Sequence, residues 1–355
     1  MAPTQDLHRS DRAPLAIAAL VGAVGLSLAL AVTLLSPAAR AAEETGFYRG
    51  KTITLISGSA AGGAYDAYAR LLARFIGKQI AGNPSVVVQD MPGAGSLTAV
   101  RYLDGNGAKD GTVLVTFNPT LVTASITEPE QTSVRFTDLA WIGSMTHEFR
   151  VCYAWHTTGI KSWDALKSAK EFVIGATGTG TANYVNGAIL RNLFGIRIRQ
   201  VLGYAGAAQQ RLAIERGEID GSCSEWTALP PDWIAQRKAL ALVRWLPTAP
   251  ADFTQTAPYI GDLATGEERR IIEMLVAPSI LGNPFAASRQ VPAARIALLR
   301  AGFDATMRDP DFLAEAAKQK MPVEPTDGAA VEKIVAGIYA SATPSLVEKA
   351  KEAMK

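Results

Sequence analysis

A run of small residues between a strand pattern and a helix pattern offers backbone amides to an anion. Residues 52–56 read as a buried strand, and Ser57 to Gly63 follow as a loop that ends in a glycine pair. Aromatic and apolar residues then recur at helical spacing up to Phe75. The first amides of a helix lack partners within the helix, and its dipole favours negative charge there. The alternative is a tight turn in which Asp66 caps the helix.

The same arrangement recurs twice further along the chain. Residues 172–176 read as a strand that leads into 177–181, a loop rich in glycine and threonine, and then into a helix ended by Gly195. Residues 200–203 lead in the same way into 204–207 and a helix ended by Gly217. Threonine hydroxyls add hydrogen-bond donors to these loops. The recurrence favours binding of a small anion over three unrelated turns.

The N-terminal segment has the pattern of a signal peptide. Arg9 and Arg12 form a basic region, residues 15–35 are apolar without a charge, and Ala39-Arg40-Ala41 is an A-x-A cleavage site. We expect residues 1–41 to be a signal peptide cleaved after Ala41, which exports the chain to the periplasm. The apolar run is long enough that an uncleaved membrane anchor is the alternative.

Signals for catalysis are weak. The chain has three histidines, and neither His147 nor His156 has a metal-ligand partner three or four residues away. We find no G-x-S-x-G, G-x-G-x-x-G or P-loop motif. Cys223, between two serines, resembles a nucleophile, but an oxidising compartment disfavours a free reactive thiol. We therefore expect no catalytic residue, no metal site and no cofactor.

Composition and element order indicate the fold class. The 35 basic and 33 acidic residues are almost balanced and form no basic cluster, which argues against nucleic-acid binding. Strand and helix patterns alternate from Tyr48 to Trp245, and the C-terminal third reads as helical, with helices from Pro292, from Asp309 and over 328–355. This alternation predicts an α/β fold with parallel sheets covered by helices on both faces.

Six short motifs, in order and spacing, resemble one family. They are Ile53-Thr54-Leu55 with Gly62-Gly63 and Asp66, Pro92-Gly93-Ala94-Gly95, Asp110-Gly111, Gly175-Ala176-Thr177-Gly178-Thr179-Gly180, Gly203-Tyr204-Ala205-Gly206 and Gly217-Glu218-Ile219-Asp220. On these motifs the chain is similar to the periplasmic solute receptors of tripartite tricarboxylate transporters, the Bug family, from about Phe47 to its C-terminus.

The resemblance implies a two-lobed periplasmic-binding-protein type II fold, a venus-flytrap with a hinge and a ligand cleft between the lobes. The first lobe would hold residues 42–146 and 250–355, and the second lobe 147–249. Such a receptor would be a monomer that captures a small organic anion, a carboxylate, and delivers it to a membrane permease. The rival interpretations are a secreted hydrolase or lyase on the same fold and a membrane-anchored ligand sensor.

The resemblance also implies which residues face the ligand. They lie on the first-lobe loop, after the third strand, on the facing second-lobe loops and at the cleft edge: Ser57, Ala61, Gly62, Gly63, Tyr65, Asp66, Asn118, Thr177, Gly178, Thr179, Thr181, Tyr204, Ala205, Gly206, Ser224 and Glu225. Asp66 would act as a cap or face an amine on the ligand. Tyr65, with Tyr68 and Trp226, would line an aromatic ligand's site or pack in the interior.

Two features of this chain depart from the family. Ser59-Ala60-Ala61 stands where the family has a proline-rich run, and Ser224-Glu225 stands where many relatives carry an Asp-Asn pair. A charge has therefore moved at the cleft edge, so the ligand's identity does not carry over. Cys152 and Cys223 fall on two strands of the second lobe. Export favours a disulfide between them, and two buried thiols are the alternative.

Overall fold

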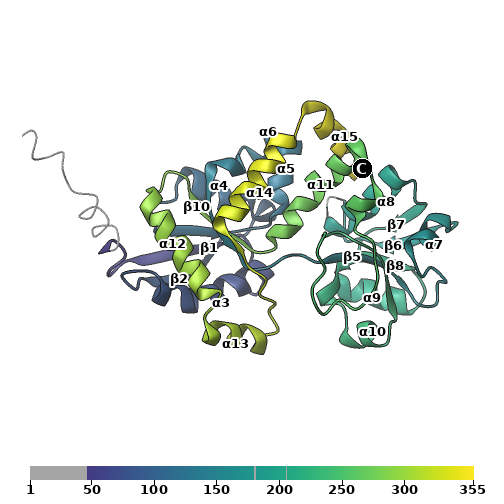
Figure 1. Ribbon diagram of the computed structural model, residues 1–355, viewed down its shortest axis with the longest axis horizontal. Coiled ribbons are helices and arrows are strands. Elements are labelled where there is room, and N and C mark those ends of the chain that lie inside the picture. Colours follow the sequence, from purple (N-terminus) through teal and green to yellow (C-terminus); the bar gives the residue numbers. More distant parts are fainter. Residues whose placement is uncertain (1–45, 180, 205) are drawn as a thin grey trace, which may run out of the picture. The chain divides into compact units, whose positions relative to one another are not determined.

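Two β-sheets organise the chain from Tyr48 to Lys355 (Figure 1). The computed structural model describes residues 46–179, 181–204 and 206–355. The predicted signal peptide, residues 1–41, and two loop residues, Gly180 and Ala205, lie outside the described residues.

The first sheet has the strand order β11-β4-β10-β3-β1-β2. Strand β1 is parallel to β2 and β3, whereas β10 is antiparallel to both β3 and β4, and β11 is antiparallel to β4. The strands are β1 (Thr52–Ser57), β2 (Ser85–Asp90), β3 (Val113–Thr116), β4 (Leu139–Ser144), β10 (Pro284–Ser288) and β11 (Thr326–Asp327).

The second sheet has the order β7-β6-β8-β5-β9. Strand β6 is parallel to β7 and β8, and β5 is antiparallel to β8 and β9. The strands are β5 (Arg150–Trp155), β6 (Phe172–Gly175), β7 (Ile198–Val201), β8 (Gly221–Glu225) and β9 (Ala239–Arg244).

The prediction of parallel sheets was wrong, because both sheets are mixed. The prediction of a purely helical C-terminal third was wrong at β10, which runs antiparallel between β3 and β4. Its sequence, PFAAS, is buried at every position and therefore lacks the alternation that marks a half-exposed strand. Its pairing partners also lie far away in the chain, and a local sequence pattern carries no information about such distant pairing.

Helices cover the sheets, and several begin and end where the sequence indicated. Ser162 caps α7 by accepting a hydrogen bond from the Ala165 amide, and Asp309 caps α13. Gly195 ends α8 in the left-handed conformation at φ 64°. The α-helices are α3 (Ala64–Gln79), α4 (Leu97–Gly105), α5 (Thr120–Thr127), α6 (Pro129–Thr132), α7 (Trp163–Ser168), α8 (Ala182–Phe194), α9 (Ala207–Glu215), α10 (Pro231–Ala235), α11 (Gly266–Val276), α12 (Ala293–Thr306), α13 (Pro310–Lys318), α14 (Gly328–Ser341) and α15 (Pro344–Met354).

Five short 3₁₀ segments complete the described elements. They are η1 (Ala94–Ser96), η2 (Phe136–Asp138), η3 (Trp226–Ala228), η4 (Ile260–Leu263) and η5 (Ala277–Leu281). Most of them lie between a strand and a helix, where the chain changes direction.

Each sheet has its own hydrophobic core. Phe117, Phe136 and Trp141 pack together beside the first sheet. Beside the second sheet, the rings of Tyr153 and Trp226 pack edge to face. Residues between Ala257 and Val276 contribute to this second core. The lobe boundaries stay a prediction. The second core includes residues after 249, which is the predicted end of the second lobe.

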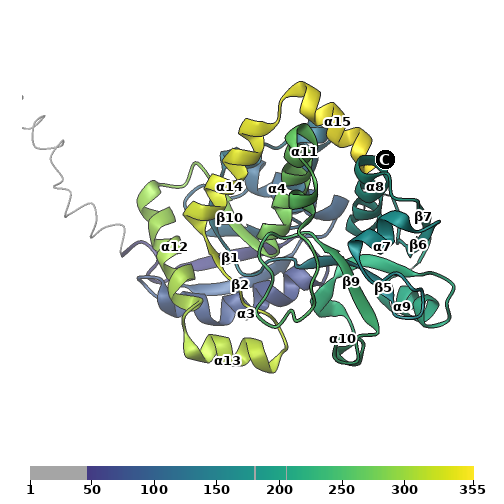
Figure 2. The same cartoon turned by 45° about the vertical axis from the view of Figure 1, so that its right-hand side comes forward.

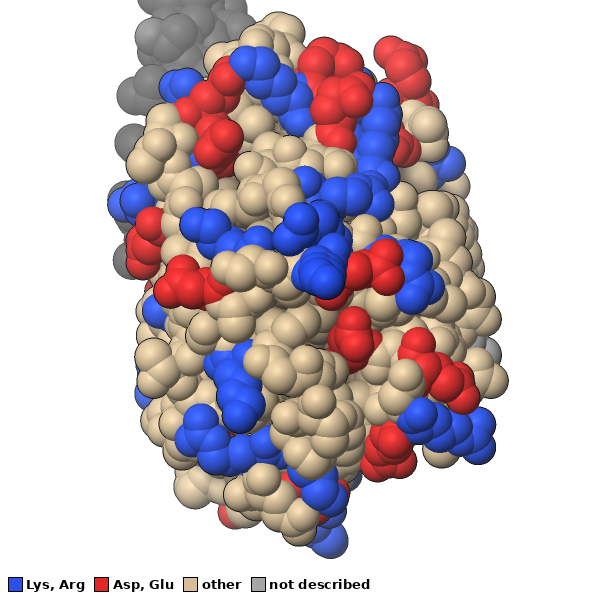
Figure 3. Space-filling model, turned by 90° about the vertical axis from the view of Figure 1, so that its right-hand side faces the viewer, with Lys and Arg blue, Asp and Glu red and all other residues tan. Residues whose placement is uncertain are grey.

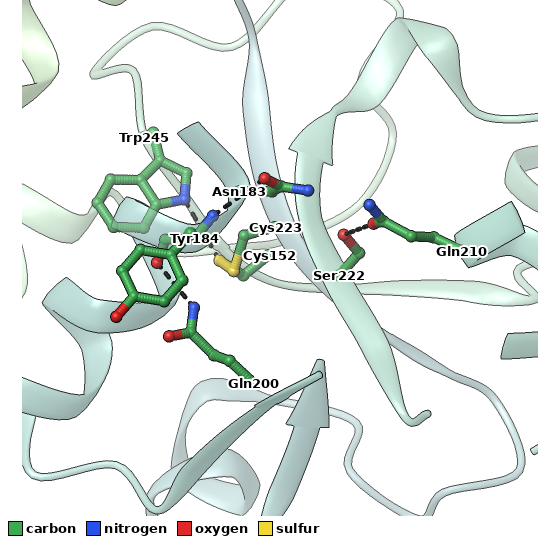
Figure 4. The surroundings of a disulfide bond; sticks show 8 residues. All are labelled: Cys152, Asn183, Tyr184, Gln200, Gln210, Ser222, Cys223 and Trp245. Carbon is green, nitrogen blue, oxygen red and sulfur yellow. Dashed lines mark hydrogen bonds between the residues drawn. A yellow bond between two sulfur atoms is a disulfide. The ribbon is translucent and has the colours of Figure 1, made fainter. Parts of the chain in front are cut away.

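A disulfide joins two strands of the second sheet (Figure 4). Cys152 on β5 and Cys223 on β8 are directly opposed in the strand register, with Cα atoms 3.9 Å apart. The indole Nε1 of Trp245 donates to Cys152 Sγ at 3.4 Å. The bond connects residues that are 71 positions apart in the sequence.

The last helix, α15, crosses from the first-sheet core to the second-sheet elements. It packs against α8, and the two helices lie side by side in Figures 1 and 2. Tyr184 Oη and Arg191 Nη2 both donate to the carbonyl oxygen of Lys355, and Asn192 Nδ2 donates to that of Glu352. These contacts connect the end of the chain to a helix that follows β6.

Candidate functional site

The loop between β1 and α3 is held by its own side chains. Ser57, the last residue of β1, is fully buried, and its Oγ lies 3.1 Å from Ser59 Oγ. Ser59 Oγ accepts a hydrogen bond from the amide of Asp66 at 3.0 Å. The Asp66 carboxylate in turn accepts one from the amide of Gly62 at 2.7 Å. Ser59 therefore holds a first-turn amide of α3, whereas Asp66 closes the loop before the helix. The N-cap residue, Gly63, makes no side-chain cap bond, so Asp66 does not cap the helix as one of its two predicted interpretations had it.

This network changes what the loop can offer an anion. The amides of Gly62 and Asp66 bond to side chains of the loop, and the Gly63 amide donates to the carbonyl of Ala60 at 2.9 Å. Gly62 has φ 78°, which favours glycine, whereas Gly63 has an ordinary φ of −72°. A Cβ on Gly63 would lie 2.8 Å from Ser59 Oγ. The glycine pair therefore serves the loop's own closure.

Asp66 belongs to a charged cluster at the start of α3. Arg70 Nε lies 2.6 Å from Asp66 Oδ1, and Arg70 Nη2 lies 3.0 Å from Asp90 Oδ2. Burial raises the pKa of Asp66, but bonds from Arg70 and the Gly62 amide outweigh it and hold that pKa below its ordinary value. Burial and the neighbouring Asp66 raise the pKa of Asp90. The cluster orients Asp66 toward its own loop.

The facing loop between β6 and α8 is more open. Thr177 and Thr179 are exposed, and a Cβ on Gly178 would meet nothing within 4 Å. Thr181 Oγ1 lies 2.6 Å from both the Gly178 carbonyl oxygen and Asn183 Oδ1. This loop retains the space and the hydroxyl groups that a ligand-binding loop requires.

The remaining predicted residues have varied surroundings. Asn118 Oδ1 accepts hydrogen bonds from the amide and hydroxyl of Thr120, which fixes the start of α5. Ser224 pairs with Val151 across the second sheet, and Tyr204 packs against the second core. Gly206 precedes α9 in an extended conformation with open space around it, and Ala61 is exposed.

A half-buried ion pair lies on the segment that connects the two sheets. Arg150, the first residue of β5, donates from Nε and Nη2 to Glu148 Oε2 at 2.9 and 2.6 Å. Burial raises the pKa of Tyr65, and Glu148 raises it further, while Arg150 opposes the change. Tyr65, on α3, and the connecting segment are therefore close enough to interact electrostatically.

Glu225, at the end of β8, interacts with the same charges. Burial raises its pKa to about 7, Arg150 opposes this, and Glu148 adds to it. Its Oε1 accepts from Thr227 at 3.2 Å, but its buried Oε2 has no hydrogen-bond partner. Burial together with Glu225 and Glu324 raises the pKa of Tyr68 to about 12. Tyr65 and Glu225 thus both respond to the charges of Glu148 and Arg150, whereas Tyr68 responds to Glu225 and Glu324.

A cavity of about 430 Å³ lies between α5 and α8, next to this group. Its volume is within the range of small-molecule sites. Two of its residues, Thr123 and Asn186, are more than nine-tenths buried, and Thr123 Oγ1 and Asn186 Nδ2 have no hydrogen-bond partner. The cavity is lined by Pro119, Thr120, Thr123, Ala124, Thr127, Glu128, Glu148, Arg150, Ala182, Val185, Asn186, Leu275, Pro278, Ser279, Lys351, Met354 and Lys355.

The sequence analysis missed the polar residues of this cavity. Glu148 and Arg150 fall between strand patterns and belong to no motif. Asn186 has a weak signal, because it is a polar residue on the buried face of α8, together with the apolar residues Ile189 and Leu190. Thr123 has no signal in the sequence. Threonine is common on helices, where its hydroxyl can bond to a carbonyl oxygen of the preceding turn.

Other classes of site are absent from the described part of the chain. Between residues 46 and 355, apart from Gly180 and Ala205, no group of three or more His, Cys, Asp or Glu side chains is placed to hold a metal ion. In the same residues, no helix combines the length and apolar character needed to cross a bilayer. The face shown in Figure 3 carries basic and acidic side chains interspersed.

Comparisons with known proteins relate the chain to solute-binding proteins. No family model matches it. A UPF0065 protein from an intergenic region of Agrobacterium vitis is 26% identical over 208 residues, so the chain spans only 58% of that relative's length and matches over 57% of its own.

Solved structures match over most of the chain. A TctC solute-binding protein from Polaromonas shares 20% identity at a TM-score of 0.67 and covers 85% of this chain and 99% of its own. MatC from Rhodopseudomonas palustris, with bound malate, shares 16% identity at a TM-score of 0.55 and covers 86% and 99%. The chain therefore has the α/β fold of these two solved proteins.

Proposed function

We propose that this protein is an extracytoplasmic receptor that captures a small organic anion, a carboxylate, between its two sheets. The observation that carries the proposal is the cavity at Arg150, because its walls come from α5 on the first-sheet side and α8 on the second. A site with walls from two separate cores can close on a ligand by a hinge motion and open to release it.

The chemistry of the site favours a carboxylate. Arg150 is a permanent cation, and α8 directs its N-terminal amides toward the residues that precede it. Two threonines of α5, Thr120 and Thr123, lie in the wall of the cavity. The similarity to MatC, a protein of the same fold with bound malate, supports the same class of ligand.

Binding without catalysis fits these residues better than a hydrolase or lyase. The two cysteines are bonded to each other, and the interactions of His147 are with Thr326 and Glu324. We propose that the chain acts in the periplasm as a monomer after removal of residues 1–41. It would deliver its ligand to the membrane permease of a tripartite tricarboxylate-type transporter.

A thermal-shift screen tests this function. The mature protein is heated with mono-, di- and tricarboxylates, each at millimolar concentration. A compound that binds only the folded state raises the midpoint of unfolding, by mass action, in a concentration-dependent way. A carboxylate that raises the midpoint while its amide or alcohol analogue does not supports the proposal. The absence of any shift across the panel contradicts it.

A further inference from the structure

The helices α8 and α15 belong to different hydrophobic cores, yet they contact each other (Figures 1 and 2). Leu346, Ala350 and Ala353 of α15 are buried in the core beside the first sheet. Ile189 and Leu190 of α8 are buried in the core beside the second sheet. The contact between the two helices is therefore also a contact between the two cores.

Side chains of α8 hold the C-terminal turn of α15, residues 351–355. Tyr184 Oη and Arg191 Nη2 donate to the carbonyl oxygen of Lys355 at 2.7 and 2.6 Å. Asn192 Nδ2 donates to the carbonyl oxygen of Glu352 at 3.1 Å. The last carbonyl groups of a helix have no partner within the helix, so α8 supplies donors that α15 lacks. The arginine also places a positive charge at the negative end of the helix dipole.

The surroundings of these bonds suit a contact that breaks and forms again. All three bonds are exposed, so water can take the place of either partner. Two cavities border the same turn, one of about 430 Å³ lined by Met354 and Lys355 and one of about 310 Å³ lined by Glu352 and Ala353. Among the apolar side chains of α8, Leu193 packs against both cores.

A movement of one core relative to the other acts directly on these bonds. The donors are fixed to the second core through α8, and the acceptors are fixed to the first core through α15. A motion that separates the two cores therefore increases the distances between donors and acceptors. Each such bond contributes about two- to tenfold to an equilibrium constant.

We propose that the C-terminal turn of α15 and the three donors Tyr184, Arg191 and Asn192 form a latch. The latch holds the two cores in the arrangement described above, and it opens when they move apart. It thereby sets the ratio of the two arrangements, which a ligand with different affinities for them shifts further. This inference rests on the hinge motion of the proposed function, but not on the identity of a ligand.

The distance between two spin labels, one beside each core, tests the latch. Ala336 on α14 and Ala235 on α10 are exposed, and the neighbouring residues of these helices are buried in the first and the second core. Cysteines introduced at these two positions take the labels, because Cys152 and Cys223 are bonded to each other. Pulsed electron paramagnetic resonance of the mature protein, without added ligand, then gives the distribution of label distances.

The latch variant combines Tyr184→Phe, Arg191→Met and Asn192→Ala, which remove the three donors. The ratio of molecules at longer label distances to those at shorter distances should rise at least about tenfold. Arg191→Met alone removes one of the three bonds and should change this ratio by about two- to tenfold. The single variant also decides the question if the triple variant does not fold.

Arg197→Met is the matched control. Arg197 also donates to a carbonyl group at the end of a helix, that of Ala169 after α7, but both residues belong to the elements of the second sheet. Its loss should leave the label distances unchanged. A shift in the latch variants without a shift in Arg197→Met supports the latch. Equal distributions in the latch variants and wild type, or equal shifts in the control, overturn it. The thermal-shift screen tests the proposed function separately, so a failure of the latch alone leaves that function intact.

Discussion

The carboxylate of Asp66 accepts a hydrogen bond of 2.7 Å from the amide of Gly62, four residues earlier, and thereby closes the loop that leads into α3. Its other oxygen lies 2.6 Å from Arg70. We expect Asp66→Ala to lower the free energy of unfolding by about 1–3 kcal/mol, because a charge-assisted hydrogen bond and an ion pair are lost together. Urea denaturation measures this. Asp66→Asn keeps the oxygen that accepts from Gly62 and should cost less. Equal stability of Asp66→Ala and wild type would show that the bond to Gly62 does not stabilise the fold.

The disulfide should stabilise the second sheet. Cys152 and Cys223 are 71 residues apart, and in the chain-entropy model a cross-link over such a loop contributes on the order of 4 kcal/mol. The double variant Cys152→Ala, Cys223→Ala should unfold at a clearly lower urea concentration than the oxidised protein. The reduced wild type should resemble the variant. Alkylation of both thiols in unreduced material, detected by mass, would contradict the bond itself.

Glu225 should make stability depend on pH. Burial raises its pKa from 4.5 to about 7 in the folded protein, so the folded state binds a proton more tightly than the unfolded state between these values. Stability should therefore fall as pH rises from about 4.5 to about 7, by at most about 3 kcal/mol. Glu225→Gln removes this titrating group. The unfolding free energy of the variant should therefore fall less than that of the wild type over the same pH range. Parallel pH profiles for the two proteins would show that Glu225 titrates normally.

Glycine substitutions should distinguish the two candidate loops. A Cβ on Gly178 would meet nothing within 4 Å, whereas one on Gly63 would lie 2.8 Å from Ser59 Oγ and 3.0 Å from the Ala60 carbonyl oxygen. We expect Gly178→Val to fold as stably as wild type and, if its loop faces the ligand, to bind at least about tenfold more weakly. Gly63→Val should instead lose stability by itself. Circular dichroism melts and calorimetry with the best acid of the panel separate the two effects, and a Gly178→Val protein with full affinity would remove that loop from the site.

The strands and helices of the first half of the chain were predictable because each has a local signal. The apolar run of β1, the cap at Ser162 and the left-handed Gly195 depend on neighbouring residues only. Strand β10 gives no such signal, because its sequence, PFAAS, shows neither alternation nor a run of large apolar residues. Its partners β3 and β4 end at residues 116 and 144, far earlier in the chain.

The site was harder to predict than the fold. The glycine pair was found from its spacing, but whether its amides are available depends on where the Asp66 carboxylate turns, which spacing does not determine. Thr123 of α5 and Asn186 of α8 line one cavity, although the two helices lie beside different sheets. Neither residue is remarkable in its local sequence, so their proximity became evident only from the three-dimensional arrangement.

The central position of β10 has a consequence for synthesis. Strands β3 and β4 are complete once residue 144 has been made, yet the strand that separates them does not exist until Ser288 has been added. Until then both keep an unpaired edge, and exposed edges promote association between chains. The five strands from Arg150 to Arg244, in contrast, need no later strand to complete their sheet. A nascent or truncated chain that stops before residue 284 should therefore contain one finished sheet and one open sheet, and the open sheet is where a holding chaperone would be needed.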